Sequence, residues 1–376
     1  MDLYRELTSQ GHQVQVLCPR PSRPMGFAFS DGVAANVNVC HLPSYFAPGP
    51  NPLKRLWESI SFGWHCYRFI KAAQAKYDLV YLNSWPLFSQ AFIVKACVQG
   101  GMPSAVHVQD MYPESLINKL PSWLGRLVSV LLMPIDRYVL SRANRVIVIS
   151  AKMKDYLRAT RHLPEEKMVT VINWQDESPF ISYRPAGEAL PGEEKLTFMY
   201  CGNVGPVAGI DVLIDGFAQA GMVQARLVIA GSGSYRDAYV AHARKYPGCD
   251  IQFWDVPAGK VPEMQSRADV MLLPLRKGAA ASSIPSKLPA YMFSAKAVLA
   301  ALDGDSDTAG AIRAADCGVI CPPESPEAIA EAMCRIAQSP REQLDRWGHN
   351  GRQYALAHFT RSKNLRVLMD TLINLA

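Results

Sequence analysis

The sequence predicts an α/β protein of two domains, each built on a doubly wound parallel sheet. In both halves of the 376-residue chain, short apolar runs rich in Val, Leu and Ile alternate with helical patterns. Such runs are typical of parallel strands that are covered on both faces. A polar segment over 176–194 with three prolines separates the halves, as a linker would. The length suffices for two hydrophobic cores.

The first half contains five expected strands and two long expected helices. The strands are expected at 13–18, 36–41, 78–82, 104–109 and 145–149, and the helices at 53–76 and 122–142. Pro134 should kink or split the second helix. The chain opens with a helical pattern at 2–10, whereas an α/β domain normally opens with a strand and a turn. We therefore expect that a first strand and a glycine-rich turn, roughly 15 residues, are missing.

The second half repeats this alternation. Strands are expected at 195–201, 226–230, 250–254, 269–273, 297–301 and 317–320. Helices are expected at 209–220, 234–245, 286–295, 307–315, 325–338, 340–357 and 361–375. The predicted organisation is a first domain over 1–178, a linker over 179–194, a second domain over 195–357 and a terminal helix over 358–376 that packs back on the first domain. Two such sheets place a ligand cleft at their carboxyl ends.

Composition excludes several classes of protein. About half of the residues are apolar (49%), 19% are charged, and no run of roughly 20 apolar residues could form a transmembrane helix. The net charge of +6 suits an anionic substrate or membrane face but is too diffuse for nucleic acid. None of the nine cysteines forms a C-x-x-C pair. We expect reduced, mostly buried cysteines in a cytoplasmic protein without a bound metal.

A candidate phosphate site lies where the strand at 269–273 leads through a loop of small residues to the helix that begins near Ser286. Lys287 falls in the first turn of that helix, where a cation is unfavourable unless an anion is present. A diphosphate would remove this conflict. The alternative is that Ser286 caps the helix and Lys287 is merely solvated.

Glycine-containing turns follow two further strands of the second half. Gly202 and Gly205 follow the strand at 195–201, and Gly231 follows the strand at 226–230. Glycine permits close approach of a ligand to the backbone. A single Gly-x-x-Gly is often only a tight turn, but three loops at one sheet edge favour a binding site.

Candidate catalytic groups lie at the end of the strand at 104–109. His107 is inside this strand, and Asp110 and Glu114 follow its tip, where catalytic groups lie in this architecture. The two carboxylates could bind or deprotonate an acceptor hydroxyl. The alternatives are a hydrogen-bonded core histidine and a helix-capping Asp110.

An ordered set of strings gives the chain a resemblance to a known family. They are Arg142–Ser150, Asn173-Trp174, Tyr200–Gly205, Pro285-Ser286-Lys287, Asp307-Thr308 and Cys317–Pro323. Together they resemble family-four retaining glycosyltransferases. The string Asp110–Ser115 resembles the Asp-x-Trp-Pro-Glu-Ser of the branch that includes N-acetyl-L-fucosamine and colanic-acid transferases. The resemblance runs from Gly11 to Tyr354 and implies a GT-B fold with two Rossmann-like domains facing a central cleft.

The resemblance also implies site residues and substrates. A nucleotide-sugar donor, with UDP favoured, would bind the second domain without a metal ion, and the acceptor would bind the first. Lys287 would pair with the diphosphate. The remaining predicted donor residues are Gly202, Asn203, Gly205, Gly231, Val256, Arg276, Lys277, Ser282, Ser286, Asp307 and Thr308. The broader family carries two glutamates at the positions of Ser282 and Ala290, so the donor-ribose contact is unassigned here.

The resemblance implies a glycan or polyprenyl-diphosphate-linked acceptor in bacterial capsule, O-antigen or exopolysaccharide synthesis. The enzyme would then make peripheral contact with the cytoplasmic face of the inner membrane. The aromatic and basic residues at 53–76 and the apolar residues at 122–142 fit such contact, although both helices could simply cover the sheet. Two other functions stay open: a non-catalytic GT-B subunit that binds a nucleotide or a partner, and a nucleotide-sugar 2-epimerase.

Overall fold

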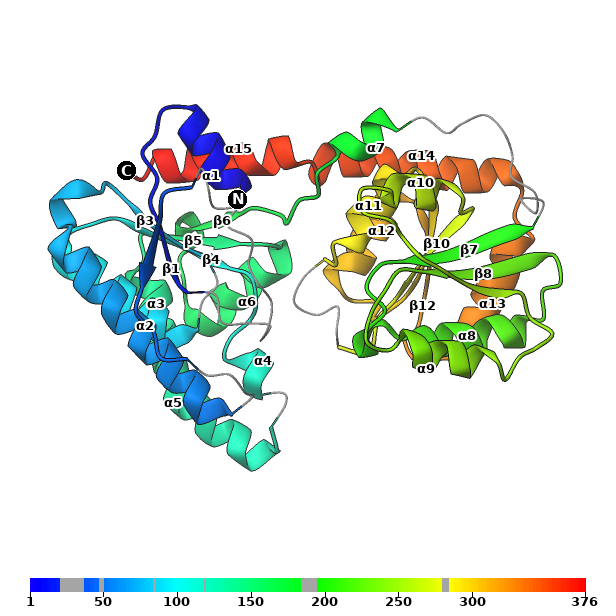
Figure 1. Ribbon diagram of the computed structural model, residues 1–376, viewed down its shortest axis with the longest axis horizontal. Coiled ribbons are helices and arrows are strands. Elements are labelled where there is room, and N and C mark those ends of the chain that lie inside the picture. Colours follow the sequence, from blue (N-terminus) through cyan, green and yellow to red (C-terminus); the bar gives the residue numbers. More distant parts are fainter. Residues whose placement is uncertain (21–36, 47–50, 84–85, 118–119, 184–194, 279–283) are drawn as a thin grey trace. The chain divides into compact units, whose positions relative to one another are not determined.

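The computed structural model describes residues 1–20, 37–46, 51–83, 86–117, 120–183, 195–278 and 284–376. The chain divides into two compact units, one of Met1–Val171 with Leu365–Ala376 and one of Ile172–Asn364 (Figure 1). The division falls at Val171, before the expected boundary at 178, because Ile172 and Phe180 pack into the core of the second unit. The first residues of the expected linker belong to a short helix, α7 (Ser178–Ser182), and residues 184–194 lie outside the described residues.

The strands of the first unit form two parallel sheets. Strands β1 (Val16–Pro19) and β2 (Val39–Leu42) pair with each other. The larger sheet has the order β3-β4-β5-β6, with bounds Val80–Asn83, Ser104–Val108, Arg145–Val148 and Met168–Thr170. The five expected strands are confirmed within a few residues. Strand β6 was missed because three residues are too few to show a periodic pattern.

Up to Val171 the first unit contains six described α-helices, of which α2, α3, α5 and α6 contribute to its core. They are α1 (Asp2–Ser9), α2 (Pro52–Ala72), α3 (Leu87–Gly100), α4 (Glu114–Ile117), α5 (Ser122–Arg142) and α6 (Ala151–Arg161). Single 3₁₀ turns lie at Gln74–Lys76 and Glu165–Lys167. The core contains Phe62 of α2, Val94 of α3, Val139 of α5 and Leu157 of α6.

Of the two effects expected of Pro134, a kink or a split, the split was wrong, because α5 runs unbroken from Ser122 to Arg142. A proline leaves the carbonyl four residues earlier, here that of Val130, without its helical donor. Both Pro134 and Val130 are exposed, so water can satisfy that carbonyl.

The second unit contains one parallel sheet of six strands in the order β12-β11-β10-β7-β8-β9. The strands are β7 (Leu196–Cys201), β8 (Ala225–Ala230), β9 (Ile251–Trp254), β10 (Val270–Pro274), β11 (Ala297–Ala301) and β12 (Gly318–Cys321). The chain winds outward from β7 to β9 and then returns to build the other half from β10. The boundary between β7 and β10 is therefore the point where the winding direction reverses.

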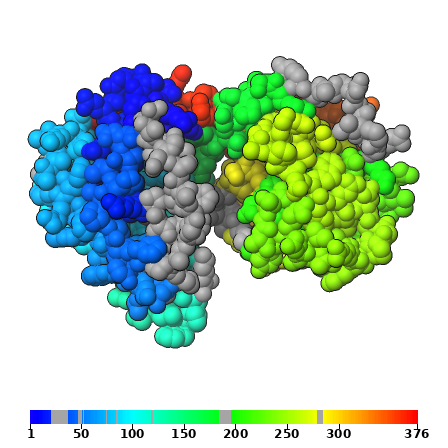
Figure 2. Space-filling view, viewed as in Figure 1, coloured from blue at the N-terminus to red at the C-terminus, as the bar shows by residue number. Residues whose placement is uncertain are grey.

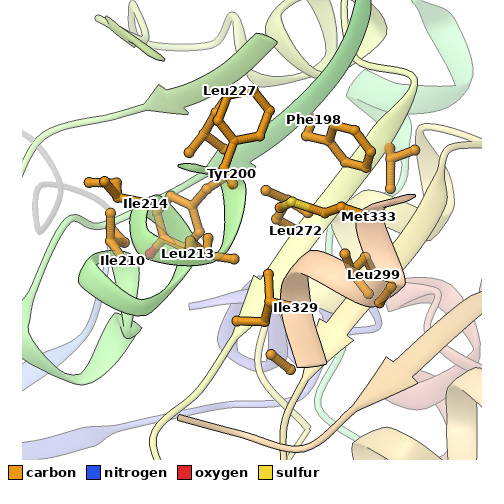
Figure 3. Packing of buried hydrophobic residues seen from close by; sticks show 14 of the residues in the cluster. Phe198, Tyr200, Ile210, Leu213, Ile214, Leu227, Leu272, Leu299, Ile329 and Met333 are labelled. Atoms are coloured by element: carbon orange, nitrogen blue, oxygen red, sulfur yellow. The ribbon is translucent and has the colours of Figure 1, made fainter. Parts of the chain in front are cut away.

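Both faces of this sheet are buried. In β7, Phe198 and Tyr200 point into one core (Figure 3), whereas Met199 and Cys201 point into the other. This alternation is the two-residue period of a strand between two helical layers. Helices α8 (Ile210–Ala220), α9 (Arg236–Ala243) and α13 (Pro326–Ala337) contribute to the first core. Helices α11 (Lys287–Phe293) and α12 (Asp307–Ala315) contribute to the second.

The remaining helices are α10 (Val261–Ser266), α14 (Arg341–His358) and α15 (Arg361–Ile373). Helix α15 begins in the second unit, and its residues from Leu365 onward group with the first. All nine cysteines are free thiols, as expected, and five of them are buried. Within the described ranges, no helix is both long and apolar enough to cross a bilayer.

Candidate functional site

The candidate site lies at the carboxyl ends of β7 and β10 in the second unit. Strand β7 runs into the turn at 202–205, and β10 leads through a loop to α11. The two strands are hydrogen-bonded neighbours on either side of the point where the sheet reverses direction. Ligands of doubly wound sheets bind at this point because the connections on its two sides diverge and leave a crevice.

The glycine turns after β7 and β8 pack directly against each other. The Gly202 N–H donates to the Ala230 carbonyl (2.9 Å), and the Val204 N–H donates to the Ser232 carbonyl (2.9 Å). A Cβ atom at Gly231 would lie 2.1 Å from the Gly202 oxygen. Only glycine permits this approach, so the predicted turns form one continuous backbone surface.

Lys287 lies across this surface. A Cβ atom at Gly202 would lie 2.4 Å from Lys287 Cε, and Lys287 Nζ lies 5.4 Å from the centroid of the Tyr200 ring. Burial lowers the pKa of Lys287, and the neighbouring Cys201 acts in the opposite direction. Within the described residues, no carboxylate forms an ion pair with Lys287. Its charge is held over a glycine backbone and an aromatic ring, an arrangement that an anionic ligand would stabilise.

Two tyrosines that were not among the predicted site residues shape this site. The hydroxyl of the fully buried Tyr291 donates to the Cys201 carbonyl (3.0 Å) and accepts from the Cys201 N–H (3.1 Å). Tyr291 thus joins α11 to the end of β7. The Tyr200 hydroxyl donates to the Asn203 carbonyl (2.5 Å) and holds the turn. Tyr200 begins one of the family strings, but only the structure reveals the bonds of either residue.

The other predicted residues after β10 differ from Lys287 in their surroundings. Arg276 pairs with Asp211 (2.6 Å) and lies 3.5 Å from Glu324. Its charge is therefore already compensated. Lys277 is exposed. Ser286 begins α11 without a side-chain capping bond and is also exposed, and Ser282 lies outside the described residues.

The remaining predicted donor residues lie at the same edge of the sheet. Thr308 is fully buried in the first turn of α12, after β11, and its hydroxyl oxygen has no hydrogen-bond partner within the described residues. Asp307 precedes it and is half-buried. Asn203 is exposed on the turn after β7, and Val256 packs against the core after β9. The donor set thus extends along the sheet edge from β11 to β9.

In the first unit, His107 is a buried side chain with both ring nitrogens engaged. The Gln109 amide nitrogen donates to Nε2 (2.8 Å), which leaves Nδ1 to donate to the Tyr81 oxygen (2.7 Å). Burial lowers the pKa of His107 to about 4, so the imidazole is neutral at pH 7.

The two predicted carboxylates of the first unit lie in different surroundings. Asp110 is exposed just beyond β4. Glu114 receives two hydrogen bonds from the guanidinium of Arg161, at 2.5 and 2.8 Å. Although burial acts to raise it, the pKa of Glu114 is lowered by its bonds to Arg161. The sequence patterns did not single out Arg161, yet its spacing from Met153 and Leu157 places it on the buried face of α6.

Two family models together cover nearly all of the chain. Residues 1–174 match the glycosyl transferase 4-like domain, and residues 187–354 match glycosyl transferases group 1. The protein belongs to the group 1 glycosyltransferases of the GT-B fold, which confirms the predicted fold class.

One curated relative is the probable glycosyltransferase WbjE of Pseudomonas aeruginosa. It is 24% identical over 250 residues, which are 61% of this chain and 59% of WbjE. The match therefore spans somewhat more than half of that relative.

Solved structures share the fold at low sequence identity. Sucrose-phosphate synthase from Thermosynechococcus elongatus has a TM-score of 0.73 at 17% identity and covers 99% of this chain and 91% of its own. The lipopolysaccharide glycosyltransferase WaaG has a TM-score of 0.67 at 16% identity, with coverage of 99% and 94%. Anabaena HepE in complex with UDP has a TM-score of 0.65 at 16% identity, with coverage of 90% and 86%.

Proposed function

We propose that this protein is a retaining, metal-independent glycosyltransferase that uses a UDP-sugar. The observation that carries the proposal is Lys287, a partly buried cation without a carboxylate partner among the described residues, set against Gly202 where the sheet reverses direction. A diphosphate there would receive the lysine charge and backbone N–H groups. The same contacts would stabilise the charge that develops on the departing nucleotide. The complexes of HepE with UDP and with UDP-glucose support the choice of nucleotide.

The acceptor we propose is a glycan or a polyprenyl-diphosphate-linked sugar of bacterial surface-polysaccharide assembly. The role of WaaG in lipopolysaccharide biosynthesis supports this class, and the Asp110–Ser115 string supports the N-acetyl-L-fucosamine and colanic-acid transferase branch. Asp110 is exposed at the carboxyl end of β4 and is the candidate acceptor-hydroxyl base or ligand.

Nucleotide binding tests the donor assignment. Thermal shift and calorimetry with UDP, GDP, TDP and ADP in EDTA should show selective binding of UDP to the wild type. Lys287→Ala should weaken that binding by about 10- to 100-fold, as for loss of a charged hydrogen bond. Lys195→Ala is a matched control, because Lys195 lies beyond the opposite end of β7 and already pairs with Asp250 (2.9 Å).

The outcomes of this test separate the alternatives. Binding that survives in Lys287→Ala would remove that residue from the donor site. Absence of binding by any nucleotide would favour a non-catalytic subunit. Release of UDP and an epimerised sugar without an acceptor would favour the 2-epimerase.

We also propose peripheral contact of the first unit with an anionic membrane. Large apolar side chains of α2 and α5 are exposed, among them Leu53 (74%), Trp57 (57%), Trp123 (70%) and Val130 (71%). Figure 2 shows the blue surface of α2 and, at the end of the same unit, the blue-green surface around the start of α5. Lys54 and Arg55 are exposed beside Leu53, and such combinations bind anionic lipid headgroups.

Vesicle sedimentation tests this contact. Vesicles that contain phosphatidylglycerol should sediment the wild type, and neutral phosphatidylcholine vesicles should sediment less of it. The double variant Trp57→Ser, Trp123→Ser should lose most of the binding, whereas exchange of Val223, an exposed apolar residue (80%) of the second unit, should not. Equal sedimentation of all three proteins would contradict the proposal.

A further inference from the structure

We propose that Arg161 is a positioning residue that holds the segment 109–114 at the carboxyl end of β4, with Glu114 as its anchor and not as a catalytic group. This inference rests on the proposed function, because that function gives the segment its place on the acceptor side of the reaction.

Arg161 is a fully enclosed cation at the end of α6, with a side-chain exposure of 0%. Its Nε donates to Asp136 Oδ2 of α5 (2.7 Å), and its Nη1 and Nη2 donate to the two carboxylate oxygens of Glu114 (2.5 and 2.8 Å). Nη2 also lies 3.4 Å from the Tyr112 carbonyl. A single guanidinium therefore joins α6, α5, the start of α4 and the backbone that follows β4.

This arrangement restricts orientation more than it contributes to stability. Two parallel hydrogen bonds between a guanidinium and a carboxylate restrict both distance and angle, which a lysine ammonium cannot do. Buried ion networks add little net stability over apolar residues of similar volume, because desolvation of the charges offsets their attraction. The most direct consequence of the Arg161 network is that Glu114 and Tyr112 have fixed positions.

The segment is held at its other end as well. Gln109 bonds to the buried His107 of β4, whereas Glu114 bonds to Arg161. Asp110 lies between these anchors and is exposed. Of the three groups predicted as catalytic, His107 and Glu114 thus hold the segment, and Asp110 is the one presented to solvent.

Hydrogen exchange tests the clamp without reference to activity. Three amides just after the segment bond back to its carbonyls: the Ser115 N–H donates to the Met111 carbonyl (2.8 Å), and the Leu116 and Ile117 N–H groups donate to the Pro113 carbonyl (both 3.0 Å). In Arg161→Lys these amides should exchange about tenfold faster or more, because their local opening becomes easier. Exchange in α3 and in β3 should stay unchanged.

Arg158→Lys is the matched control on the same helix, since Arg158 is 53% exposed and pairs with Asp155 (2.9 Å) at the surface. It should leave exchange unchanged throughout the first unit. Unchanged exchange at 109–117 in Arg161→Lys would overturn the proposal. A uniform increase across the first unit would also overturn it, because Arg161 would then act on the fold as a whole.

A double-mutant cycle tests the consequence for catalysis. Arg161→Lys should lower kcat for transfer from a UDP-sugar to a polyprenyl-diphosphate-linked sugar by about tenfold, and this effect should vanish in an Asp110→Asn background. The Kd for UDP should stay within about twofold of the wild-type value, because the donor residues belong to the other unit. Additive effects of the two substitutions would overturn the positioning role. A wild type that binds no UDP would instead refute the proposed function, and the exchange experiment would still decide on the clamp.

Discussion

Two cations, one in each unit, each contact the segment that follows a strand, but in contrasting surroundings. Arg161 of the first unit is fully enclosed and is bonded to the carboxylates of Glu114 and Asp136. Lys287 of the second unit is partly buried over Gly202 and the Tyr200 ring, and no carboxylate among the described residues pairs with it. Burial lowers the pKa of the lysine, whereas the two carboxylates raise the pKa of the arginine despite its burial.

We propose that this difference separates a cation that serves the folded structure from a cation that binds a ligand. A buried charge is expensive, so a cation that serves only the fold is expected to have its counter-ions within the fold. A partly buried cation without a counter-ion is energetically unfavourable, and such unfavourable arrangements concentrate at functional sites. By this rule Arg276, although it lies in the predicted donor loop, is expected to serve the fold, because Asp211 compensates its charge.

The largest expected effect is a loss of stability on replacement of Arg161, the cation with carboxylate partners. Arg161→Met leaves two carboxylates without their partner and should lower the free energy of unfolding of the first unit by about 3–5 kcal/mol. Arg158→Met removes only a surface pair and should change it by less than about 1 kcal/mol. Urea titrations of both variants measure the difference. Equal losses of stability in the two variants would contradict the view that Arg161 is a buried structural cation and Arg158 a surface one.

The buried histidine should give a pH-dependent effect of similar size. The pKa of His107 falls from 6.5 to about 4 on burial, so below pH 6.5 the unfolded chain binds a proton that the folded chain does not. Stability is therefore lost as the pH falls from 6.5 to 4, by about 3 kcal/mol. His107→Gln lacks this loss. Urea titrations of wild type and variant at pH 7 and pH 4 measure the free energy of unfolding of each. Between pH 7 and pH 4 the wild type should lose about 3 kcal/mol more than the variant. Equal losses would contradict a neutral imidazole in the folded protein.

Substitution of Gly202 should lower the affinity for UDP through the contact with Lys287, and the positive φ of Gly202 (154°) should add a moderate loss of stability. Gly202→Ala places a methyl group against the flexible end of Lys287, which can move, so UDP affinity should fall about tenfold. Gly231→Ala has the same kind of backbone strain (φ of 134°) and also places a methyl group 2.1 Å from a backbone oxygen, so it should lower Tm more than Gly202→Ala. Calorimetry and thermal melts of the pair test this. A large Tm loss in Gly202→Ala with normal affinity would contradict the geometry.

The smallest expected effect is a gain in stability on replacement of Lys287, the cation without a carboxylate partner among the described residues. Lys287→Met should raise the stability of the ligand-free protein by about 0.5–1 kcal/mol, or roughly 1–4 °C in Tm, while UDP no longer raises it further. The folded-state pKa of Lys287 is below its ordinary value, so the unfolded chain binds more protons in the window between the two pKa values. The advantage of the variant should therefore shrink as pH rises through this window towards 10.5. Destabilisation by Lys287→Met would instead indicate a structural role.

The sequence by itself determined the class of fold and most of the strands, whereas the helices α3, α6 and α10 were not predicted. Short apolar runs located eleven of the twelve strands that the structure describes, because parallel strands covered on both faces must be apolar on both. The first-turn position of Lys287 and the glycines after β7 and β8 are also local patterns, and they correctly indicated one edge of the second sheet.

Only the tertiary structure decided which charges have partners. Glu114 and Arg161 are 47 residues apart in the chain, and Arg276 and Asp211 are 65 apart, so no local pattern reveals either pair. The same holds for the contact of Lys287 with Gly202, which arises because β10 returns to lie beside β7. A sequence determines periodicity and local preference, whereas compensation of charge depends on distances that exist only after the strands have assembled.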